Sequence, residues 1–459
     1  MTQPLPTETV VASEAASASP VAPVRGAGWL LLLLVLLNLL NYIDRYNLPP
    51  VIGPIQQEFF APGDPNANEK MGRLATGFVV VYMLTAPIFG LLADRYSRWA
   101  LVGIGMLVQS LGTFGSGFAP TFAVLLISRC VVGIGDAAYG PAAPTIISDL
   151  YPVEKRGRML AWFYAALPVG SALGFGLGGL MHGLTGNWRW GFHVLVPIMA
   201  TLGVICLFIR DKRIAPRTRH AAKLPWDQIR GLLRNRSYVI NCAAQTAMTF
   251  AIGGISYWMP KYLTDVYLRQ YPALAPEDFA RASTITSLGF SAVVVVAGLG
   301  ATLAGGWAGD RLRGRFGGSY FLVSGAGMLV GFPLLLLILV TPFPAVWGVI
   351  FLAVFALFFN TGPSNTALAN VVSPAVRASA FALNIFIIHL LGDALSPWII
   401  GVIADRSSLA MGFVVVSGTV ALGGALWLIG MPFLAADTAR AEAPDLAEPR
   451  GFEVLAKTT

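Results

Sequence analysis

The chain carries little charge. Only 12% of its 459 residues are Asp, Glu, Lys or Arg, whereas soluble domains carry about 25%. Hydrophobic residues make up 56% of the chain, which is more apolar surface than a water-soluble core of this size can hide. A set of soluble domains is therefore excluded, and one large membrane domain is the natural interpretation.

Other features are also scarce. The three cysteines and four histidines are scattered, which favours neither a disulfide framework nor a metal site, so we expect no metal and no cofactor. No Gly-Lys-Ser/Thr phosphate loop occurs, which argues against ATP-driven pumping. Residues 1–26 lack the basic start and apolar centre of a secretory signal. We expect residues 1–26 and 436–459 to form disordered cytoplasmic tails.

Twelve apolar runs of membrane-spanning length follow one another along the chain. Backbone groups in lipid must be satisfied within their own segment, so the runs predict an all-α membrane protein with twelve transmembrane helices. We place an N-terminal lobe at 27–210 and a C-terminal lobe at 237–435. Between them, residues 211–236 form a basic cytoplasmic linker, which is either a simple tether or includes a short amphipathic helix on the inner leaflet.

Basic residues predict the orientation. If the N-terminus is cytoplasmic, 22 of the 31 Lys and Arg residues lie on the cytoplasmic side and seven on the other. Membrane proteins concentrate Lys and Arg in cytoplasmic loops. The net charge of +8 thus reflects topology, and we expect no nucleic-acid partner. We expect a multi-pass protein of the cell (inner or plasma) membrane with both termini cytoplasmic.

The two halves repeat a motif. Gly90, Asp94 and Arg95 follow the second run, and Gly306, Asp310 and Arg311 follow the eighth at the same spacing. Parallel six-helix repeats are typical of transporters whose substrate site lies between the halves near the membrane midplane. The acidic residues alternatively act only as local helix caps.

These motifs resemble those of the major facilitator superfamily. Gly90, Asp94, Arg95 and Arg98 match its loop motif between helices two and three, although Ser97 replaces a usual glycine. The segments 129–135 and 188–192 resemble its helix-four motif and its turn before helix six. The resemblance implies a pseudo-symmetric 6+6 fold. It also implies a conformational latch that we extend to the second repeat, giving Gly90, Asp94, Arg95, Arg98, Asp310 and Arg311.

Within that superfamily the chain is most similar to the spinster-like group, on the segments 41–45, 135–145 and 389–397. Asp136 stands where that group usually has Glu. The resemblance implies alternating-access transport of an amphiphilic, lipid-like solute of sphingolipid or lysolipid type. Protons are the expected coupling ion, membrane lipids the surroundings and a monomer the expected state. An organic-anion/proton symporter and a multidrug exporter of the same superfamily remain alternatives.

Asp44 and Arg45 lie within the first apolar run, where a charge costs roughly 2.5–3.5 kcal/mol. Asp44 lies roughly 22 Å from the inner end of its helix and Arg129 roughly 12 Å from the outer end of its own, at 1.5 Å per residue. In a core of about 30 Å these depths nearly coincide, so we predict that Asp44 or its neighbourhood faces Arg129 within the N-terminal half. Together with Arg45 and Asp136 they form an acid–base set for proton coupling or substrate binding. The alternative is a permanent ion pair that orients helices.

His389 and Asp393 are four residues apart, so they share a face of what we expect to be an unbroken helix. We consider a gating or substrate contact, a packing hydrogen bond and, remotely, the catalytic pair of a membrane acyltransferase. The remaining cavity candidates are polar or aromatic residues within apolar runs: Asn41, Tyr139, Gln245, Tyr257, Trp258, Asn360 and Asn365. A glycine-rich run at 170–179 predicts close helix packing.

Overall fold

The computed structural model describes residues 26–211, 226–272, 278–373 and 376–442, and within these ranges the regular elements are all helices. Their order is α1 Ala27–Tyr46, η1 Pro49–Val51, α2 Ile52–Phe59, α3 Ala67–Arg95, α4 Arg98–Gly117, α5 Phe122–Leu150, α6 Val153–Tyr164, α7 Ala166–Thr185, α8 Trp190–His193, α9 Leu195–Leu207, α10 Trp226–Arg234, α11 Arg236–Gln270, α12 Asp278–Arg313, α13 Ser319–Ile338, α14 Val346–Phe358, α15 Thr361–Asn370, α16 Arg377–Ile388, η2 His389–Asp393, α17 Ser396–Arg406 and α18 Leu409–Glu442.

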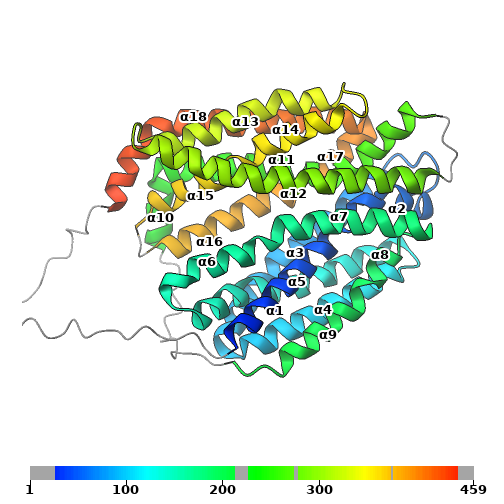
Figure 1. The fold of residues 1–459 in the computed structure, drawn as a ribbon, viewed down its shortest axis with the longest axis horizontal. Helices are drawn as coiled ribbons and strands as arrows, with labels where there is room; N and C mark the ends of the chain where they lie inside the picture. The colour runs from blue at the N-terminus through cyan, green and yellow to red at the C-terminus, as the bar shows by residue number, and fades with distance from the viewer. Residues whose placement is uncertain (1–25, 212–225, 273–277, 374–375, 443–459) are drawn as a thin grey trace, which may run out of the picture.

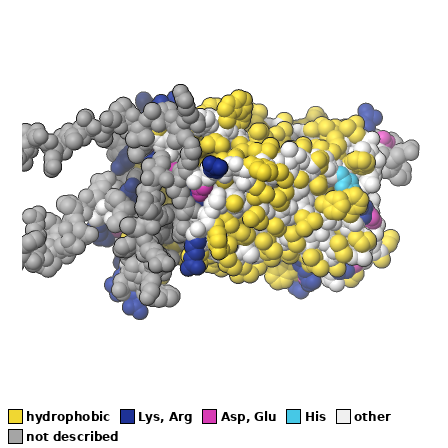
Figure 2. All heavy atoms as spheres, turned by 90° about the horizontal axis from the view of Figure 1, so that it is seen from below, with side chains coloured by type: hydrophobic (Ala, Val, Ile, Leu, Met, Phe, Trp, Pro, Cys, Tyr) yellow, Lys and Arg dark blue, Asp and Glu magenta, His cyan; other side chains and the backbone are white. Residues whose placement is uncertain are grey.

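Within the described ranges, twelve segments are long and apolar enough to cross a membrane. The predicted all-α fold with twelve spanning helices is confirmed. Figure 2 shows a broad hydrophobic band across the face in view, with Lys and Arg gathered toward its two ends. Such a band is what a bilayer covers, because apolar side chains replace the charged surface of a soluble protein.

The helices form two lobes (Figure 1), one built from α1–α9 and the other from α11–α18. The start of α1 and the end of α18 lie on the same side of the molecule, which we call the tail side. On the opposite side, which we call the closed side, α3 packs against α17 and α7 against α12. The lobes are thus joined away from the chain ends.

The first span is longer than predicted. The apolar run ends near Leu48, but the structure continues through a 3-10 turn and α2, so that the span covers Ala27–Phe59. Pro49 and Pro50 lack N–H donors, which is tolerated in the first turn of a helical segment, where donors have no intrahelical partner. The two prolines therefore interrupt the α-helix without ending the span.

The C-terminal boundary also differs. Residues from 436 onward were expected to be a disordered tail, but α18 runs to Glu442. The buried carboxylate of Asp437 explains this, because it accepts a hydrogen bond from the backbone N–H of Ser237 at 2.9 Å and one from Arg440 at 2.9 Å. In the linker, α10 supplies the short helix considered above. Residues 1–25, 212–225 and 443–459 lie outside the described ranges.

The glycine-rich run lies in α7, between α1 of its own lobe and α12 of the other. A Cβ at Gly178 would collide with the carbonyl oxygen of Asn47, and one at Gly179 would lie 2.6 Å from the Cβ of Ser287. Thr284 of α12 donates a hydrogen bond to the carbonyl of Gly179 at 2.8 Å. Missing side chains thus bring three backbones close together, as predicted.

Gly178→Ala should destabilise the fold, because the new methyl meets a backbone carbonyl that cannot rotate away. We expect a loss of about 1–3 kcal/mol, the usual cost of overpacking. Gly348→Ala is the matched control, since a Cβ there meets nothing within 4 Å. Thermal unfolding in detergent checks this, and equal melting temperatures for the two variants would contradict it.

Candidate functional site

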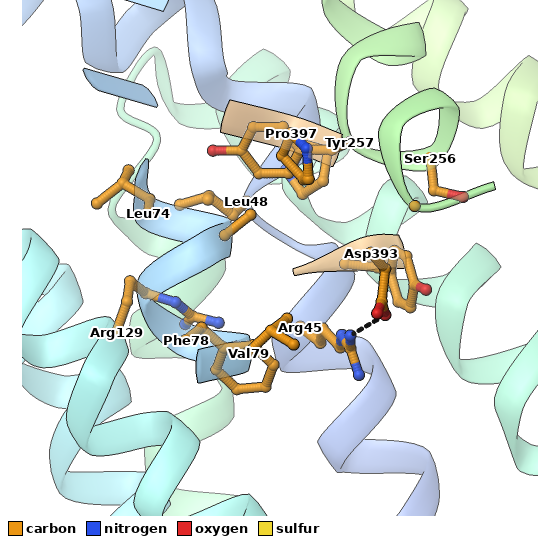
Figure 3. A pocket seen from close by; sticks show the side chains of 14 residues that line it. Arg45, Leu48, Leu74, Phe78, Val79, Arg129, Ser256, Tyr257, Asp393 and Pro397 are labelled. Atoms are coloured by element: carbon orange, nitrogen blue, oxygen red, sulfur yellow. Dashed lines mark hydrogen bonds and ion pairs between the residues drawn. The ribbon is translucent and has the colours of Figure 1, made fainter. Parts of the chain in front are cut away.

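A small cavity lies between the lobes and combines charge with apolar walls (Figure 3). Arg45, Arg129 and Asp393 supply its charges, and its apolar walls include Leu74, Phe78 and Val79. Its volume is about 60 Å³, which holds a few water molecules. A lipid-sized solute would therefore require this region to widen.

Asp44 and Arg129 meet within the N-terminal lobe. Arg129 Nη1 lies 3.4 Å from both carboxylate oxygens of Asp44, and the hydroxyl of Thr113 donates to Asp44 Oδ1 at 3.0 Å. Asp44 has no exposed surface, whereas Arg129 lines the cavity. The predicted proximity of Asp44 and Arg129 is confirmed, and the guanidinium separates the carboxylate from the cavity.

A second ion pair crosses from one lobe to the other. Arg45 Nη2 in α1 lies 3.2 Å from Asp393 Oδ2, and His389 Nδ1 lies 2.8 Å from Asp393 Oδ1. The side chains of Arg45 and Asp393 are 24% and 12% exposed, so the pair is only partly screened by water. Figure 3 shows Arg45 reaching across the cavity to Asp393. One carboxylate thus links both lobes and a histidine.

The helix that carries Asp393 is interrupted, contrary to the expectation of an unbroken helix. His389–Asp393 forms a π turn, in which the N–H of Ala394 donates to the carbonyl of His389 at 3.0 Å. Pro397 follows, and it cannot donate the helical hydrogen bond to the carbonyl of Asp393. The break therefore lies where the lobes meet the cavity, and π turns are frequent at functional sites.

Asp136 and Asn41 complete the polar set near α1. Asp136 is half-buried, interacts electrostatically with Arg45, and makes no hydrogen bond to another residue in the described ranges. Asn41 is 5% exposed, and neither amide atom has a partner among the described groups. Both side chains thus retain unused hydrogen-bonding capacity close to Arg45.

The other cavity candidates divide into three groups. Tyr257 lines the cavity and donates to the carbonyl of Met71 across the lobes at 2.5 Å. Asn365 is exposed and bonds within its own helix. The rest are buried in helix packing rather than on the cavity, because each bonds within its own lobe: Tyr139 to Leu34, Gln245 to Ser364 and Asn384, Trp258 to Pro397 and Asn360 to Leu357.

The latch candidates contact their own lobes in this conformation. Arg98 binds Asp211 at 2.8 Å and Asp149 at 2.7 Å. Asp310 accepts a hydrogen bond from Tyr320 at 2.8 Å. Arg311 lies over the ring of Trp307, Arg95 is exposed, and a Cβ at Gly90 would meet nothing within 4 Å. The side chain of Asp94 lies outside the described part of the structure.

On the closed side, a carboxylate of one lobe caps a helix of the other. Asp405, near the end of α17, accepts hydrogen bonds from the backbone N–H groups of Asn68 at 3.0 Å and Glu69 at 2.7 Å, and from Asn68 Nδ2 at 2.8 Å. These N–H groups belong to the first turn of α3, whose own N-cap residue Asn66 makes no side-chain cap. N–H groups in the first turn of a helix have no acceptor within that helix, so they attract a negatively charged side chain from elsewhere.

Sequence reasoning missed the Arg45–Asp393 pair and the Asp405 cap. The sequence-based prediction groups Arg45 with Asp44 and Arg129, which are near it in sequence or depth, and gives Asp393 only His389 as a partner. The signals were two unpaired intramembrane charges of opposite sign in different halves, and an acidic residue at a helix end. Among the described residues, no group of three or more His, Cys, Asp or Glu is placed to bind a metal.

Two lobes of six spans, closed on one side around a charged cavity, form the architecture of a membrane transporter. The family model of the Major Facilitator Superfamily matches residues 34–397. The chain belongs to this superfamily and to its spinster-like group, as the following relatives show.

Protein spinster homolog 1 of Homo sapiens is 35% identical over 430 residues, which cover 88% of this chain and 80% of the relative. Sphingosine-1-phosphate transporter SPNS2 of Mus musculus is 35% identical over 432 residues, covering 88% and 76%. These relatives are transporters rather than enzymes, so the acyltransferase alternative for His389 and Asp393 is set aside.

Solved structures share the fold. A bacterial homolog of the human lysosomal transporter spinster, in an inward-facing conformation, has a TM-score of 0.71 at 19% identity, covering 90% of this chain and 97% of that one. The xylose transporter XylE of E. coli, in an inward-open conformation, has a TM-score of 0.68 at 16% identity, covering 88% and 96%. The predicted family and fold are confirmed.

Arg129→Met should be strongly destabilising, because it leaves the sealed carboxylate of Asp44 without a counter-charge. Breaking a buried pair by removing one partner costs about 3–5 kcal/mol. Adding Asp44→Asn should recover much of this loss, since the uncompensated charge is gone. Denaturant unfolding in micelles measures both. As a control, Lys261→Met breaks a partly exposed pair with Asp265 and should cost about 1 kcal/mol or less. Equal losses for Arg129→Met and Lys261→Met would contradict this.

Asp405→Ala should let the closed side open more often, because α3 loses its cap from the other lobe. The reporter is a cysteine introduced as Ser283→Cys, in a chain without its three native cysteines. Ser283 is fully buried and donates to the carbonyl of Pro50 across the lobes. A cap is worth roughly 1 kcal/mol or more, so maleimide labelling should accelerate about fivefold or more.

Asp265→Ala is the control for that experiment, since the hydrogen bond of Asp265 with Lys261 stays within α11. Its labelling rate should match that of the unsubstituted reporter chain. Unchanged protection of the cysteine in Asp405→Ala would show that the cap does not hold the closed side.

Proposed function

We propose that the protein is a proton-coupled secondary transporter that moves an amphiphilic, lipid-like solute by alternating access. The observation that carries this proposal is the Arg45–Asp393 pair, 3.2 Å long, which joins the two lobes at a cavity with apolar walls. This contact between the lobes includes an ionisable carboxylate. A proton that neutralises the carboxylate would weaken the contact and so favour another conformation.

The tail side is the cytoplasmic side in this proposal, so the structure is the inward-facing conformer. Support comes from the 22 Lys and Arg residues assigned to that side, against seven on the other. The closed side then faces away from the cytoplasm, and both termini are cytoplasmic in the cell membrane.

The substrate has a polar head and an apolar tail. Arg45 and Arg129 would receive an anionic headgroup, while walls such as Leu74, Phe78 and Val79 would contact hydrocarbon. A relative with 35% identity is named a sphingosine-1-phosphate transporter, which favours a sphingolipid or lysolipid. A headgroup that binds Arg45 competes with Asp393, so binding weakens the link between the lobes.

A proton acts on the same link. Protonation of Asp393 removes its charge and frees Arg45, which also interacts with Asp136. Two unit charges at this separation attract by about 5 kcal/mol at an effective dielectric constant of 20, before desolvation is counted. A bias of about 5.5 kcal/mol moves a two-state equilibrium from 1:99 to 99:1, so the gross attraction within one pair is of the same order as the bias that such a shift requires.

The remaining site residues would stabilise one lobe or close the tail side. Asp44 and Arg129 would hold α1 and α5 as one rigid unit around the cavity. The latch residues Asp94, Arg98 and Asp310, with their neighbours Gly90, Arg95 and Arg311, would hold the tail side shut when the closed side opens. Their contacts within their own lobes fit a state in which that latch is released.

Transport into proteoliposomes across an imposed pH gradient tests the proposal. The panel compares two solutes that have an apolar tail, sphingosine phosphate and a lysolipid, with two that lack one, inorganic phosphate and a tail-free organic anion. We expect accumulation of the tailed compounds and a rate that changes with pH. Uptake of only the tail-free anion would instead favour the organic-anion symporter.

Asp393→Asn should retain lipid binding but lose the pH dependence of transport, because the group that accepts the proton is gone. We expect the maximal rate to fall about tenfold or more, since Asn holds Arg45 without charge. Asp265→Asn, which removes a carboxylate outside the cavity, should behave as wild type. A pH profile of Asp393→Asn that matches wild type would refute this role.

A further inference from the structure

Both lobes contact the π turn His389–Asp393 or the residue directly after it. In the C-terminal lobe, Gly253 of α11 faces the turn, and a Cβ on it would lie 2.5 Å from the Cβ and 2.8 Å from the Cα of Asp393. In the N-terminal lobe, the hydroxyl of Thr76 donates to the carbonyl of Ala394 at 2.7 Å. The residue that binds Arg45 is therefore fixed from two directions.

Gly392, which lies in the π turn, makes the corresponding close contact with α11. A Cβ on Gly392 would lie 3.1 Å from the backbone nitrogen of Phe250 and 3.2 Å from the carbonyl oxygen of Thr246. The atoms met at both glycines include backbone, which cannot rotate away as a flexible side chain does. The π turn and α11 thus touch with no space for an added methyl group.

We propose that Gly253 is a positioning residue for the Arg45–Asp393 pair: its missing side chain sets how far Asp393 stands from α11 and hence its distance from Arg45. This inference rests on the proposed function, in which that pair links the lobes. Gly253 itself binds neither proton nor solute, and it acts through Asp393.

The geometry leaves little tolerance. Relieving a 2.5 Å contact to an ordinary carbon–carbon distance of about 3.5–4 Å requires the π turn to move by about 1 Å. The Arg45–Asp393 contact is 3.2 Å, so a shift of that size takes it out of hydrogen-bonding range or re-aims it. A misplacement of about 1 Å can cost a hundredfold in rate at a site that depends on geometry.

Gly253→Ala is the direct test, with Gly254→Ala as its matched control. Both changes give the same gain in helix propensity on adjacent positions of α11. A Cβ on Gly254 first meets the terminal methyl of Ile400, which can rotate away. We expect Gly253→Ala to lower the transport rate about tenfold or more and to flatten its pH profile, and Gly254→Ala to stay within about twofold of wild type.

Non-additivity separates positioning from a general packing defect. If Gly253 acts through Asp393, Gly253→Ala should change the rate of the Asp393→Asn variant by less than about twofold. A similar tenfold loss in both backgrounds would overturn the proposal, as would a wild-type pH profile in Gly253→Ala. If wild type itself transports with no pH dependence, the proposed proton coupling fails, and the labelling measurement below still decides the role of Gly253.

That measurement needs no substrate. Labelling of the Ser283→Cys reporter should accelerate in Gly253→Ala as much as in Asp393→Asn, because each weakens the same link, and should not change in Gly254→Ala. Protection equal to that of the reporter alone would overturn the proposal. Where Gly253→Ala fails to fold, Thr76→Val replaces it, since it removes the second contact with the turn without adding bulk.

For Thr76→Val we expect a smaller acceleration of labelling in the same direction. Thr85→Val is its control on the same helix, because the hydroxyl of Thr85 bonds only to carbonyls of its own helix, the nearer being Val81 at 2.7 Å. Equal labelling in Thr76→Val and Thr85→Val would overturn the proposal.

Discussion

The ion pair between Arg45 and Asp393 is the constraint around which the two lobes are arranged. It places opposite charges of different lobes 3.2 Å apart at a cavity with apolar walls. Each charge would be costly alone at this depth, and each becomes available to another partner once the lobes separate. Leaving one charge of a poorly solvated pair without its partner is expensive, which is why the proposed mechanism lets a solute or a proton act by replacing one partner of this pair.

The closed side gives this pair its mechanical setting. Asp405 caps α3 from the other lobe, and a Cβ on Gly401 of the same helix would lie 2.5 Å from the carbonyl oxygen of Asn68. These contacts lie far from the chain ends, whereas the latch residues contact their own lobes. In the described conformation the contacts between the lobes that involve Asp405 and Gly401 therefore lie on the closed side, away from the latch residues.

The sequence predicted the fold well and the site in part. Apolar runs of about twenty residues need only a helix to satisfy their backbone, so the twelve spans follow from composition. The contact between Asp44 and Arg129 could be predicted, because counting residues along each helix gives the depth of each side chain in the membrane. Depth does not specify the direction in which a side chain points around its helix axis, so the pairing of Arg45 with Asp393 could not be derived. The π turn at His389 was missed because the apolar periodicity continues through it, and the close approach of Gly253 to Asp393 is a tertiary contact that no periodicity reveals.

The distance between the lobes on the tail side tests the central claim most directly. Spin labels at Arg158 and Arg377, which are both exposed and lie on different lobes, report it by pulsed electron paramagnetic resonance. Arg45→Gln and Asp393→Asn should each add a population at shorter distance, and the double variant should add no more than either alone. Identical distance distributions in wild type and all three variants would show that the pair does not hold the lobes.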